Sequence, residues 1–370
     1  MPSVFDPANL GKLNLSNRFV RSATWEGMAG EDGSCTTALA DLMAGLAEGG
    51  VGLIISSHAF VSPEGQAGPW QLGLHDDDNL RSFKDMTEKV HSAGGTMVAQ
   101  LAHAGCFAAS KLTGRQPVGP SDMDLGDGNT CRGLEPEEIQ KLVFSFAVAA
   151  VRAKRAGFDG VQIHAAHGYC LSQFLSPHFN TRQDEYGGDV AGRARIVLDI
   201  LRAIKREAGT EYPVLIKINA QDFLTSGLSV EDMLSICRML ADEGLDGVEM
   251  SGGTLRSGTY IPSRTTPIKG PEDEVYYADE ARRFKQHLDL PLILVGGIRS
   301  VEVAEQLVAD GNADFISLAR PLVREPDLIK RWQSGDRHPA ACVSDNQCFK
   351  PIFDGRGIAC LTAEKEGRAR

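Results

Sequence analysis

The sequence of 370 residues lacks a hydrophobic run long enough to cross a membrane. A spanning helix needs about 20 consecutive apolar residues, whereas the longest apolar run, 143–151, is interrupted by Ser145. The first residues contain neither the basic segment nor the apolar stretch of a secretory signal. We therefore expect a cytoplasmic protein that does not bind a membrane.

Clusters of one charge are also scarce. The formal net charge is −11, and no block of like charges is longer than three residues. Nucleic-acid surfaces require clustered positive charge, so we expect small molecules as partners and no nucleic acid, with a homo-oligomer possible. Hydrophobic residues make up 42% and charged residues 24% of the chain. These proportions are typical of a folded globular protein and exclude intrinsic disorder.

Eight cysteines occur in a chain without a visible export signal, which favours free thiols or metal ligands over a disulfide framework. Three of them, Cys342, Cys348 and Cys360, fall within the last thirty residues. The five scattered cysteines are expected to be thiols; they are Cys35, Cys106, Cys131, Cys170 and Cys237.

One pattern recurs five times: a helical stretch, a glycine-containing turn, and a run of four to six β-forming residues. Glycine closes a helix in the left-handed conformation, and the following apolar run is typical of a buried parallel strand. These joints occupy 48–55, 93–99, 156–163, 243–250 and 310–317. Three further strands are predicted at 18–22, 214–218 and 292–295.

Amphipathic segments at 135–154, 230–241 and 301–309 predict helices between these strands. Eight alternating strand and helix units favour an α/β fold of the (β/α)8 barrel type. A doubly wound open sheet is the alternative, but no G-x-G-x-x-G follows any predicted strand. We expect one barrel domain over 1–340, with long loops at its mouth, and a cysteine-containing tail over 341–370 on or near the barrel.

Active sites of such barrels lie at the C-terminal ends of the strands. The densest polar cluster there is His164, His167 and Tyr169, which follow the fourth predicted strand. Two histidines and a tyrosine within six residues favour function over a structural role. After the last two strands, Gly296-Gly297 and Ala319-Arg320 predict a phosphate site made of backbone N–H groups, a helix N-terminus and a guanidinium.

The constellation resembles the Old Yellow Enzyme family of FMN-dependent oxidoreductases over about nine-tenths of the chain. The most specific matches are His-Ala-Ala-His-Gly-Tyr at 164–169, the run 174–188 from Phe-Leu-Ser-Pro-His to Tyr-Gly-Gly, and Gln-Leu-Ala-His-Ala-Gly at 100–105. The resemblance implies a barrel that holds FMN in its mouth and is reduced by NADH or NADPH.

The resemblance also implies roles for single residues. His164 and His167 would bind the carbonyl oxygen of the substrate and Tyr169 would donate a proton, while Lys217 would lie beside the flavin pyrimidine. Trp25 stands where other subfamilies place a small residue, so it either narrows the substrate pocket or belongs to the core. The residues implied to bind the cofactor are Ser22, Ala23, Thr24, Ser57, His58, Gln100, Lys217, Gly296, Gly297, Ala319 and Arg320.

The tail resembles that of larger two-flavin relatives such as bacterial 2,4-dienoyl-CoA reductase, whose four cysteines bind an iron–sulfur cluster. Here Asp345 stands in place of the second cysteine, and Cys348 comes one residue early. A cluster, or a zinc ion held with His338, is an alternative. We expect instead a tail of reduced thiols that binds no metal.

The expected function is reduction of activated C=C bonds in α,β-unsaturated carbonyl compounds. Two variants within the family stay open, one acting on enoyl thioesters and one oxidising or demethylating amines. Alternatives from other classes are a metal-dependent barrel hydrolase with His164 and His167 as ligands, and an electron carrier that uses the cysteine tail.

Overall fold

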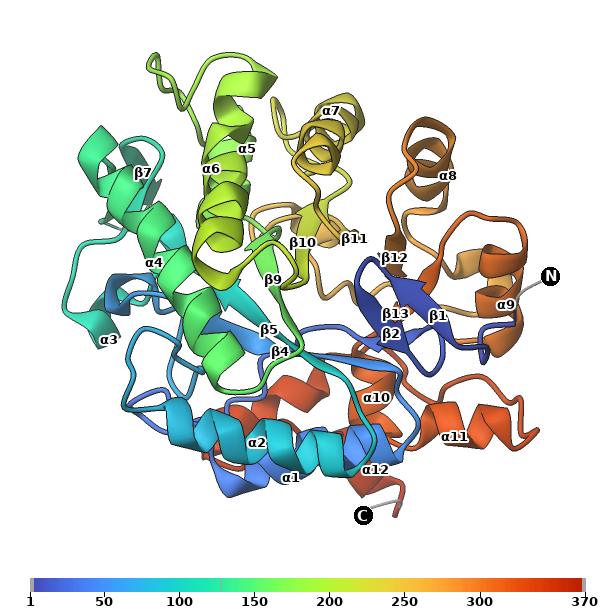
Figure 1. Ribbon diagram of the computed structural model, residues 1–370. Helices are drawn as coiled ribbons and strands as arrows, with labels where there is room; N and C mark the ends of the chain where they lie inside the picture. Colours follow the sequence, from blue (N-terminus) through green and yellow to red (C-terminus); the bar gives the residue numbers. More distant parts are fainter. Residues whose placement is uncertain (1–2, 127, 368–370) are drawn as a thin grey trace.

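Eight parallel strands form a closed barrel in the computed structural model, which describes residues 3–126 and 128–367 (Figure 1). Their order around the barrel is β3, β4, β5, β9, β10, β11, β12 and β13, and β13 pairs with β3 to close it. The barrel strands are β3 Phe19–Arg21, β4 Leu53–Phe60, β5 Met97–Ala102, β9 Gly160–Ala165, β10 Val214–Asn219, β11 Gly247–Ser251, β12 Leu292–Val295 and β13 Phe315–Leu318.

The barrel confirms the predicted fold, and each predicted strand overlaps one of its strands. The register is important for the site, because Lys217 on β10 lies opposite His164 on β9 and Glu249 on β11. Three polar side chains from adjacent strands are thereby brought to the same level of the barrel.

Helices pack around the barrel, and the three amphipathic segments form α4, α7 and α9 as predicted (Figure 1). Gly157 and Gly244, which follow the C-caps of α4 and α7 in two of the predicted joints, have φ values of +88° and +76°, a conformation that favours glycine. The helices are α1 Thr37–Glu48, α2 Leu80–Ser92, α3 Ser110–Thr113, α4 Pro136–Arg155, α5 Cys170–Leu175, α6 Val190–Ala208, α7 Val230–Asp242, α8 Ala278–His287, α9 Val301–Ala309, α10 Arg320–Arg324, α11 Leu328–Gln333 and α12 Leu361–Lys365.

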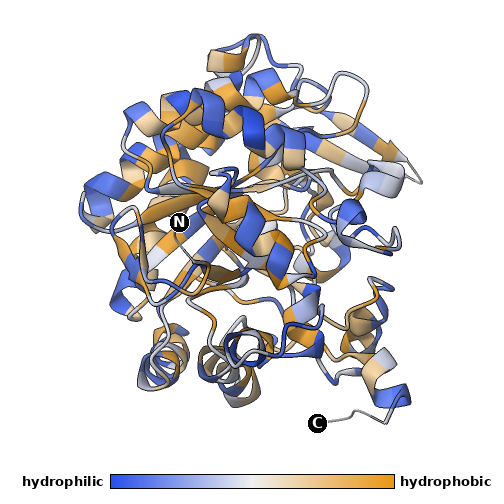
Figure 2. Ribbon diagram, turned by 90° about the vertical axis from the view of Figure 1, so that its right-hand side faces the viewer, coloured by the Kyte–Doolittle hydropathy of each residue, from blue (hydrophilic) through white to orange (hydrophobic). Residues whose placement is uncertain are grey.

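A two-stranded hairpin, β1 Ala8–Leu10 and β2 Leu13–Leu15, covers the N-terminal end of the barrel. Its buried leucines, Leu10, Leu13 and Leu15, pack in one cluster with strand residues such as Leu215 and Phe315. Figure 2 shows the apolar strands inside and polar residues on the outer faces of the helices. Because the hairpin covers this end, the polar strand ends at the opposite end are the ones left for a site.

A small sheet in the loop after β5 contradicts part of the cysteine prediction. Its strands are β6 Val118–Gly119, β7 Met123–Gly126 and β8 Asn129–Gly133. Pairing of β8 with β6 and β7 brings Cys131 to Cys106, with a Cα–Cα distance of 5.0 Å, and the two form a disulfide. The expectation of free thiols was wrong for this pair, because the contact depends on a sheet that the sequence pattern did not show.

The C-terminal segment lies against the ends of β3 and β13, beside α1 (Figure 1). A 3-10 helix, η5 Gln347–Asp354, carries Ile352 into a cluster with Cys348 and Ile358, and Trp25 packs against this cluster. The Trp25 and Phe353 rings meet edge to face with centroids 6.0 Å apart. Trp25 therefore contacts the tail, which favours the core role over the substrate role.

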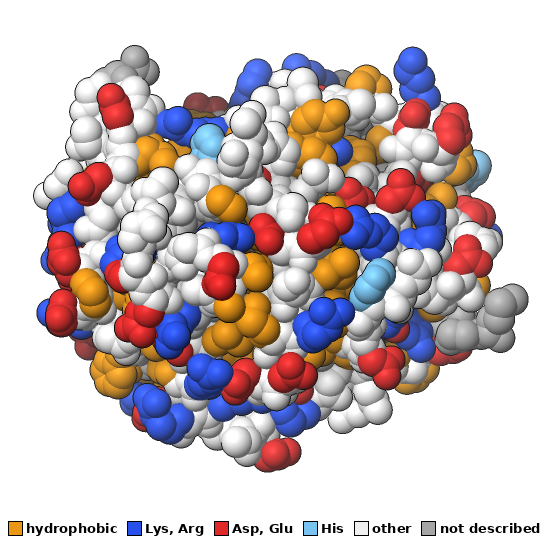
Figure 3. Space-filling model, turned by 90° about the horizontal axis from the view of Figure 1, so that it is seen from above, with side chains coloured by type: hydrophobic (Ala, Val, Ile, Leu, Met, Phe, Trp, Pro, Cys, Tyr) orange, Lys and Arg blue, Asp and Glu red, His pale blue; other side chains and the backbone are white. Residues whose placement is uncertain are grey.

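The outer surface mixes charges of both signs. On the face shown in Figure 3, acidic and basic side chains alternate without a large area of one sign. Within the described residues, no helix is both long and apolar enough to pass through a membrane.

The disulfide gives a first prediction. Protein purified without reductant and then denatured is expected to react with maleimide at six cysteines, and at all eight after reduction. Mass spectrometry counts the added groups and identifies Cys106 and Cys131 as the two protected residues. Eight modified cysteines before reduction would contradict the pairing.

Candidate active site

A buried ion pair lies inside the barrel below the candidate site. Lys217 Nζ is 3.3 Å from Glu249 Oε1, and both side chains are at most 3% exposed. Lys217 also donates to Ser22 Oγ at 2.6 Å. An ammonium has three N–H groups, so these two contacts leave one for a ligand.

Hydrogen bonds extend this pair across the barrel. Gln162 Nε2 donates to Glu249 Oε2 at 3.0 Å, and Ser317 Oγ donates to Glu249 Oε1 at 2.8 Å. Gln100 in turn donates to Gln162 Oε1 at 2.7 Å. Burial alone raises the pKa of Glu249, but Lys217 and these hydrogen bonds outweigh it and hold the pKa below its usual value. Glu249 is therefore a carboxylate at neutral pH.

The predicted histidine and tyrosine cluster is present at the end of β9. The His164 ring lies 5.3 Å from the His167 ring and 5.2 Å from the Tyr169 ring, centroid to centroid. His58, from β4, stacks at 6.4 Å from His164 and meets Tyr169 edge to face at 5.7 Å. Side chains from β4 and from the end of β9 thus form one group of four neighbouring rings.

His164 and His167 are both neutral at physiological pH. Burial lowers both pKa values well below 6.5, and the neighbouring positive charge of Lys217 lowers them further. His164 Nδ1 is buried and has no hydrogen-bond partner. Unsatisfied buried polar atoms are rare in folded proteins, so this nitrogen indicates a place for a ligand atom.

The backbone conformation of His167 is unusual, with a φ of +66°. Its N–H donates to Asn219 Oδ1 at 3.1 Å, and its Nε2 lies 2.8 Å from Ser251 Oγ. Left-handed residues other than glycine are strained and cluster at functional sites. If the Ser251 hydroxyl donates to Nε2, the proton of His167 is on Nδ1.

Tyr169 directly precedes α5 and is a protonated phenol. Burial raises its pKa to about 12. His58 is neutral, because burial lowers its pKa to about 4; its Nδ1 lies 2.7 Å from Gln71 Nε2. The group of rings therefore carries no charge of its own at neutral pH.

Of the residues predicted to follow the first two strands, Ser22 contacts Lys217 through its hydroxyl, whereas Ser57 and His58 lie within β4 instead of after it. The Ser22 N–H donates to Leu318 O, and Thr24 Oγ1 donates to Ser22 O at 3.1 Å. Ser57 is 2% exposed, and Ala23 packs against the cluster formed by the hairpin leucines and the barrel strand residues. These residues border the mouth of the barrel between β13, β3 and β4.

Some of the groups predicted to bind phosphate already have hydrogen-bond partners within the chain. The N–H groups of Arg299 and Ser300, at the start of α9, donate to Glu274 Oε2 at 2.6 and 3.0 Å. Arg320 Nη1 donates to Arg264 O and to Asn346 Oδ1, both at 2.8 Å. A carboxylate of the chain thus takes the two N–H groups just before the first turn of α9, and one Arg320 nitrogen is already used.

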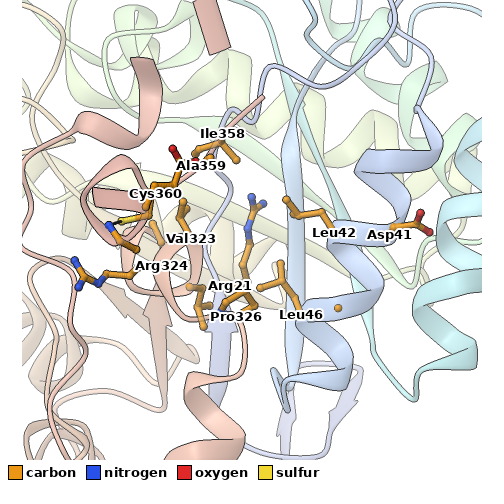
Figure 4. A pocket seen from close by; sticks show the side chains of 15 residues that line it. Arg21, Asp41, Leu42, Leu46, Val323, Arg324, Pro326, Ile358, Ala359 and Cys360 are labelled. Carbon is orange, nitrogen blue, oxygen red and sulfur yellow. Dashed lines mark hydrogen bonds between the residues drawn. The ribbon is translucent and has the colours of Figure 1, made fainter. Parts of the chain in front are cut away.

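A cavity of about 370 Å³ lies beside this region, between α1, α10 and the tail (Figure 4). Arg21 projects between Leu42 and Leu46 of α1 on one side and Val323 on the other (Figure 4). Of the predicted site residues, Ala319 alone lines it. Arg21 is held by an ion pair with Glu26 and by a 2.7 Å bond to Ile55 O.

The tail residues that resemble cluster ligands lie close together and make contacts within the tail. Asp345 accepts hydrogen bonds from Thr362 Oγ1 at 2.5 Å and from the Gln347 N–H at 3.1 Å. Cys342, Cys348 and Cys360 line one small cavity with it. Over residues 3–126 and 128–367, no three His, Cys, Asp or Glu side chains are arranged to hold a metal ion.

The NADH:flavin oxidoreductase / NADH oxidase family model matches residues 3–338. The chain belongs to this family. Membership confirms the resemblance drawn from the motifs, identifies the chemistry as FMN-dependent oxidoreduction, and implies NADH or NADPH as the reductant.

Relatives of this family differ in length and in name. The chain is 37% identical to an NADH oxidase of Thermoanaerobacter brockii, over 99% of this chain and 56% of that protein. It is 32% identical to a 4,4'-dithiodibutanoate disulfide reductase of Rhodococcus erythropolis, over 96% and 94%. The chain thus spans about half the length of the longer relatives and nearly all of the shorter one.

Solved structures show the same fold. A 2-naphthoyl-CoA reductase complex superposes with a TM-score of 0.88 at 25% identity, covering 97% of this chain and 56% of that one. Morphinone reductase in complex with tetrahydroNAD superposes with a TM-score of 0.77 at 27% identity, covering 95% and 94%.

The residues present fit the family's flavin. The remaining N–H of Lys217, the unpartnered His164 Nδ1 and the polar groups after β3 supply donors around the barrel mouth. Gln162 and Glu249 were missed by the sequence analysis, although each is a polar residue inside an otherwise apolar strand, which was a usable signal.

The buried pair gives a second prediction. Replacing Lys217 with Met leaves the Glu249 carboxylate buried without its cation, so flavin-free protein should lose about 3–5 kcal/mol of unfolding free energy. The K217M/E249Q double variant should recover a large part of that loss, because it buries no charge. Urea denaturation followed by circular dichroism measures both. A double variant as unstable as K217M would contradict the coupling.

Proposed function

We propose that the protein is an ene-reductase, which uses NAD(P)H and FMN to reduce the C=C bond of α,β-unsaturated carbonyl compounds. The observation that carries this proposal is the arrangement of His164, His167 and Tyr169 at the end of β9, where two neutral imidazoles and a protonated phenol surround one point. FMN held in the barrel mouth would supply the hydride for the β-carbon, with NAD(P)H as its source.

His164 and His167 hold the carbonyl oxygen in this proposal. Each neutral imidazole has one N–H, and the unpartnered His164 Nδ1 and the His167 nitrogen not facing Ser251 are the atoms available. As the β-carbon gains hydride, negative charge builds on the carbonyl oxygen. Fixed donors in a site of low dielectric constant stabilise that charge without reorganisation.

Tyr169 gives its phenol proton to the α-carbon. Its pKa of about 12 keeps the proton on the oxygen across the physiological range, as a general acid requires. The edge-to-face contacts with His58 and His164 fix the ring. Lys217 would offer its remaining N–H to the cofactor, and its bonds to Ser22 and Glu249 fix the ammonium in position.

Two other substrate classes are second candidates for the proposed site. A 2-naphthoyl-CoA reductase complex and histamine dehydrogenase both resemble this chain in structure, with TM-scores of 0.88 and 0.81. Enoyl thioesters and amines are therefore the alternatives to be compared with simple enones in the same assay.

Tyr169→Phe is the test of the proposed mechanism. The variant should be reduced by NAD(P)H at the wild-type rate, whereas its reoxidation by cyclohexenone should slow by about 10²–10⁴-fold because the proton donor is lost. Stopped-flow absorbance of the flavin measures the two half-reactions separately. Tyr212→Phe is the matched control, since that buried hydroxyl donates to Phe158 O and lies outside the site. Wild-type reduced protein that no enone reoxidises would refute the function.

The protonation states give a pH prediction. The reaction needs neutral histidines, which exist above their lowered pKa values, and a protonated Tyr169, which exists below about pH 12. The rate of reoxidation by enone should therefore be flat from about pH 7 to about pH 10. Rapid mixing across this range measures the profile. A rate that falls with a midpoint inside the range would contradict the assigned states.

A further inference from the structure

An arginine in the loop after β11 is enclosed by four aromatic rings. Arg264 Cζ lies 4.8 Å from the ring centroid of Tyr276, 4.9 Å from that of Tyr260, and 5.0 Å from those of Phe223 and Tyr277. The residue is 8% exposed. The loops after β10 and β11 and the residues just before α8 supply these rings, so the cage lies at the mouth of the barrel.

The cage contains three polar atoms without a hydrogen-bond partner. Arg264 Nε and Nη2 are buried and unpartnered, and so is the Tyr276 hydroxyl. No carboxylate among the described residues lies within ion-pair distance of Arg264. A buried cation without a counter-ion is destabilising by several kcal/mol, and aromatic faces offset only part of that. Three unused donors on two adjacent side chains indicate a missing oxyanion.

The position of the cage identifies which oxyanion it is. The Tyr276 N–H donates to Gly296 O at 3.0 Å, and a Cβ added at Gly297 would lie only 2.6 Å from the Tyr276 ring. The Arg264 carbonyl is held by Arg320. The cage is therefore adjacent to both pairs of residues at which the cofactor phosphate is expected.

The other donors at this end of the barrel are partly used. Glu274 takes the N–H groups of Arg299 and Ser300, just before α9, and Arg320 Nη1 donates to the chain itself. Arg264 is a second cation beside Gly297, and its Nε and Nη2 are buried and unpartnered.

We propose that Arg264 and Tyr276 bind the phosphate group of FMN. Arg264 offers Nε–H and one Nη2–H, the pair of parallel donors that matches two phosphate oxygens, and Tyr276 offers its hydroxyl to a third. The proposal rests on the FMN-dependent function given above.

The test compares FMN with riboflavin, which differs only by the phosphate. The full chain is stripped of flavin, and the dissociation constant of each is measured by fluorescence quenching. Wild type should prefer FMN, and Arg264→Met should reduce that preference by about tenfold or more, because a charge-assisted bidentate contact is lost. Tyr276→Phe, which keeps the ring, should reduce it less, by about three- to tenfold. Riboflavin affinity should stay near the wild-type value in both.

Arg18→Met is the matched control. Arg18 also lies over an aromatic ring, that of Phe315, and has a buried unpartnered Nε, but it precedes β3 at the opposite end of the barrel. The preference of the Arg18→Met variant for FMN over riboflavin should equal that of wild type. The thermal stability of flavin-free R264M should be unchanged or higher, since an unpaired buried charge has been removed.

Two outcomes would overturn the proposal. If R264M weakens FMN and riboflavin by the same factor and lowers the stability of the flavin-free protein, Arg264 is a structural support. If the preference is unchanged while KM rises only for a carboxylate-bearing enone, the arginine binds substrate instead. The first outcome is read from flavin binding and stability alone, whereas the proposed function fails separately if enones do not reoxidise the reduced enzyme.

Discussion

The buried pair of Lys217 and Glu249 is the interaction on which the site depends. A buried pair of charges depends on hydrogen bonds to its remaining donors and acceptors, and here Ser22, Gln162 and Ser317 supply them while one N–H of Lys217 stays free for a ligand. Because these residues lie on or beside five different strands, the network fixes the relative positions of the strand ends. It also places a fixed positive charge beside His164 and His167, which helps to keep both imidazoles neutral.

Each end of the barrel has a separate task. The β1–β2 hairpin covers the N-terminal end of the barrel with buried leucines, and the proposed reaction centre lies at the other end. At the C-terminal end, polar residues at the strand ends form the proposed reaction centre, and the loops after the strands surround it. The loop after β11 and the residues before α8 bring Arg264, Tyr276 and Glu274 to the side of Gly297, where an anion is expected.

The tail shows how tertiary contacts change the meaning of a motif. Its cysteine spacing resembles that of a cluster-binding segment, yet Asp345 is occupied by Thr362 and Gln347, and Trp25 packs against the hydrophobic cluster formed by Cys348, Ile352 and Ile358. In this chain the segment covers the ends of β3 and β13 and borders a cavity with α1 (Figure 4). The pairing of Cys106 with Cys131 likewise depends on a three-stranded sheet with no strong periodic signal.

Strand periodicity and short-range spacing are local properties of a sequence. They are enough to predict the barrel, the end of the barrel proposed to hold the site, and the group of His164, His167 and Tyr169. Glu249 and Gln162 were also within its reach, as polar residues in apolar strands. Only the tertiary structure decided that Glu274 occupies the start of α9 and that Arg264 is left with unused donors. Those outcomes depend on contacts between loops distant in sequence, and the free energy of a buried charge is set by all the neighbours that the fold assembles around it.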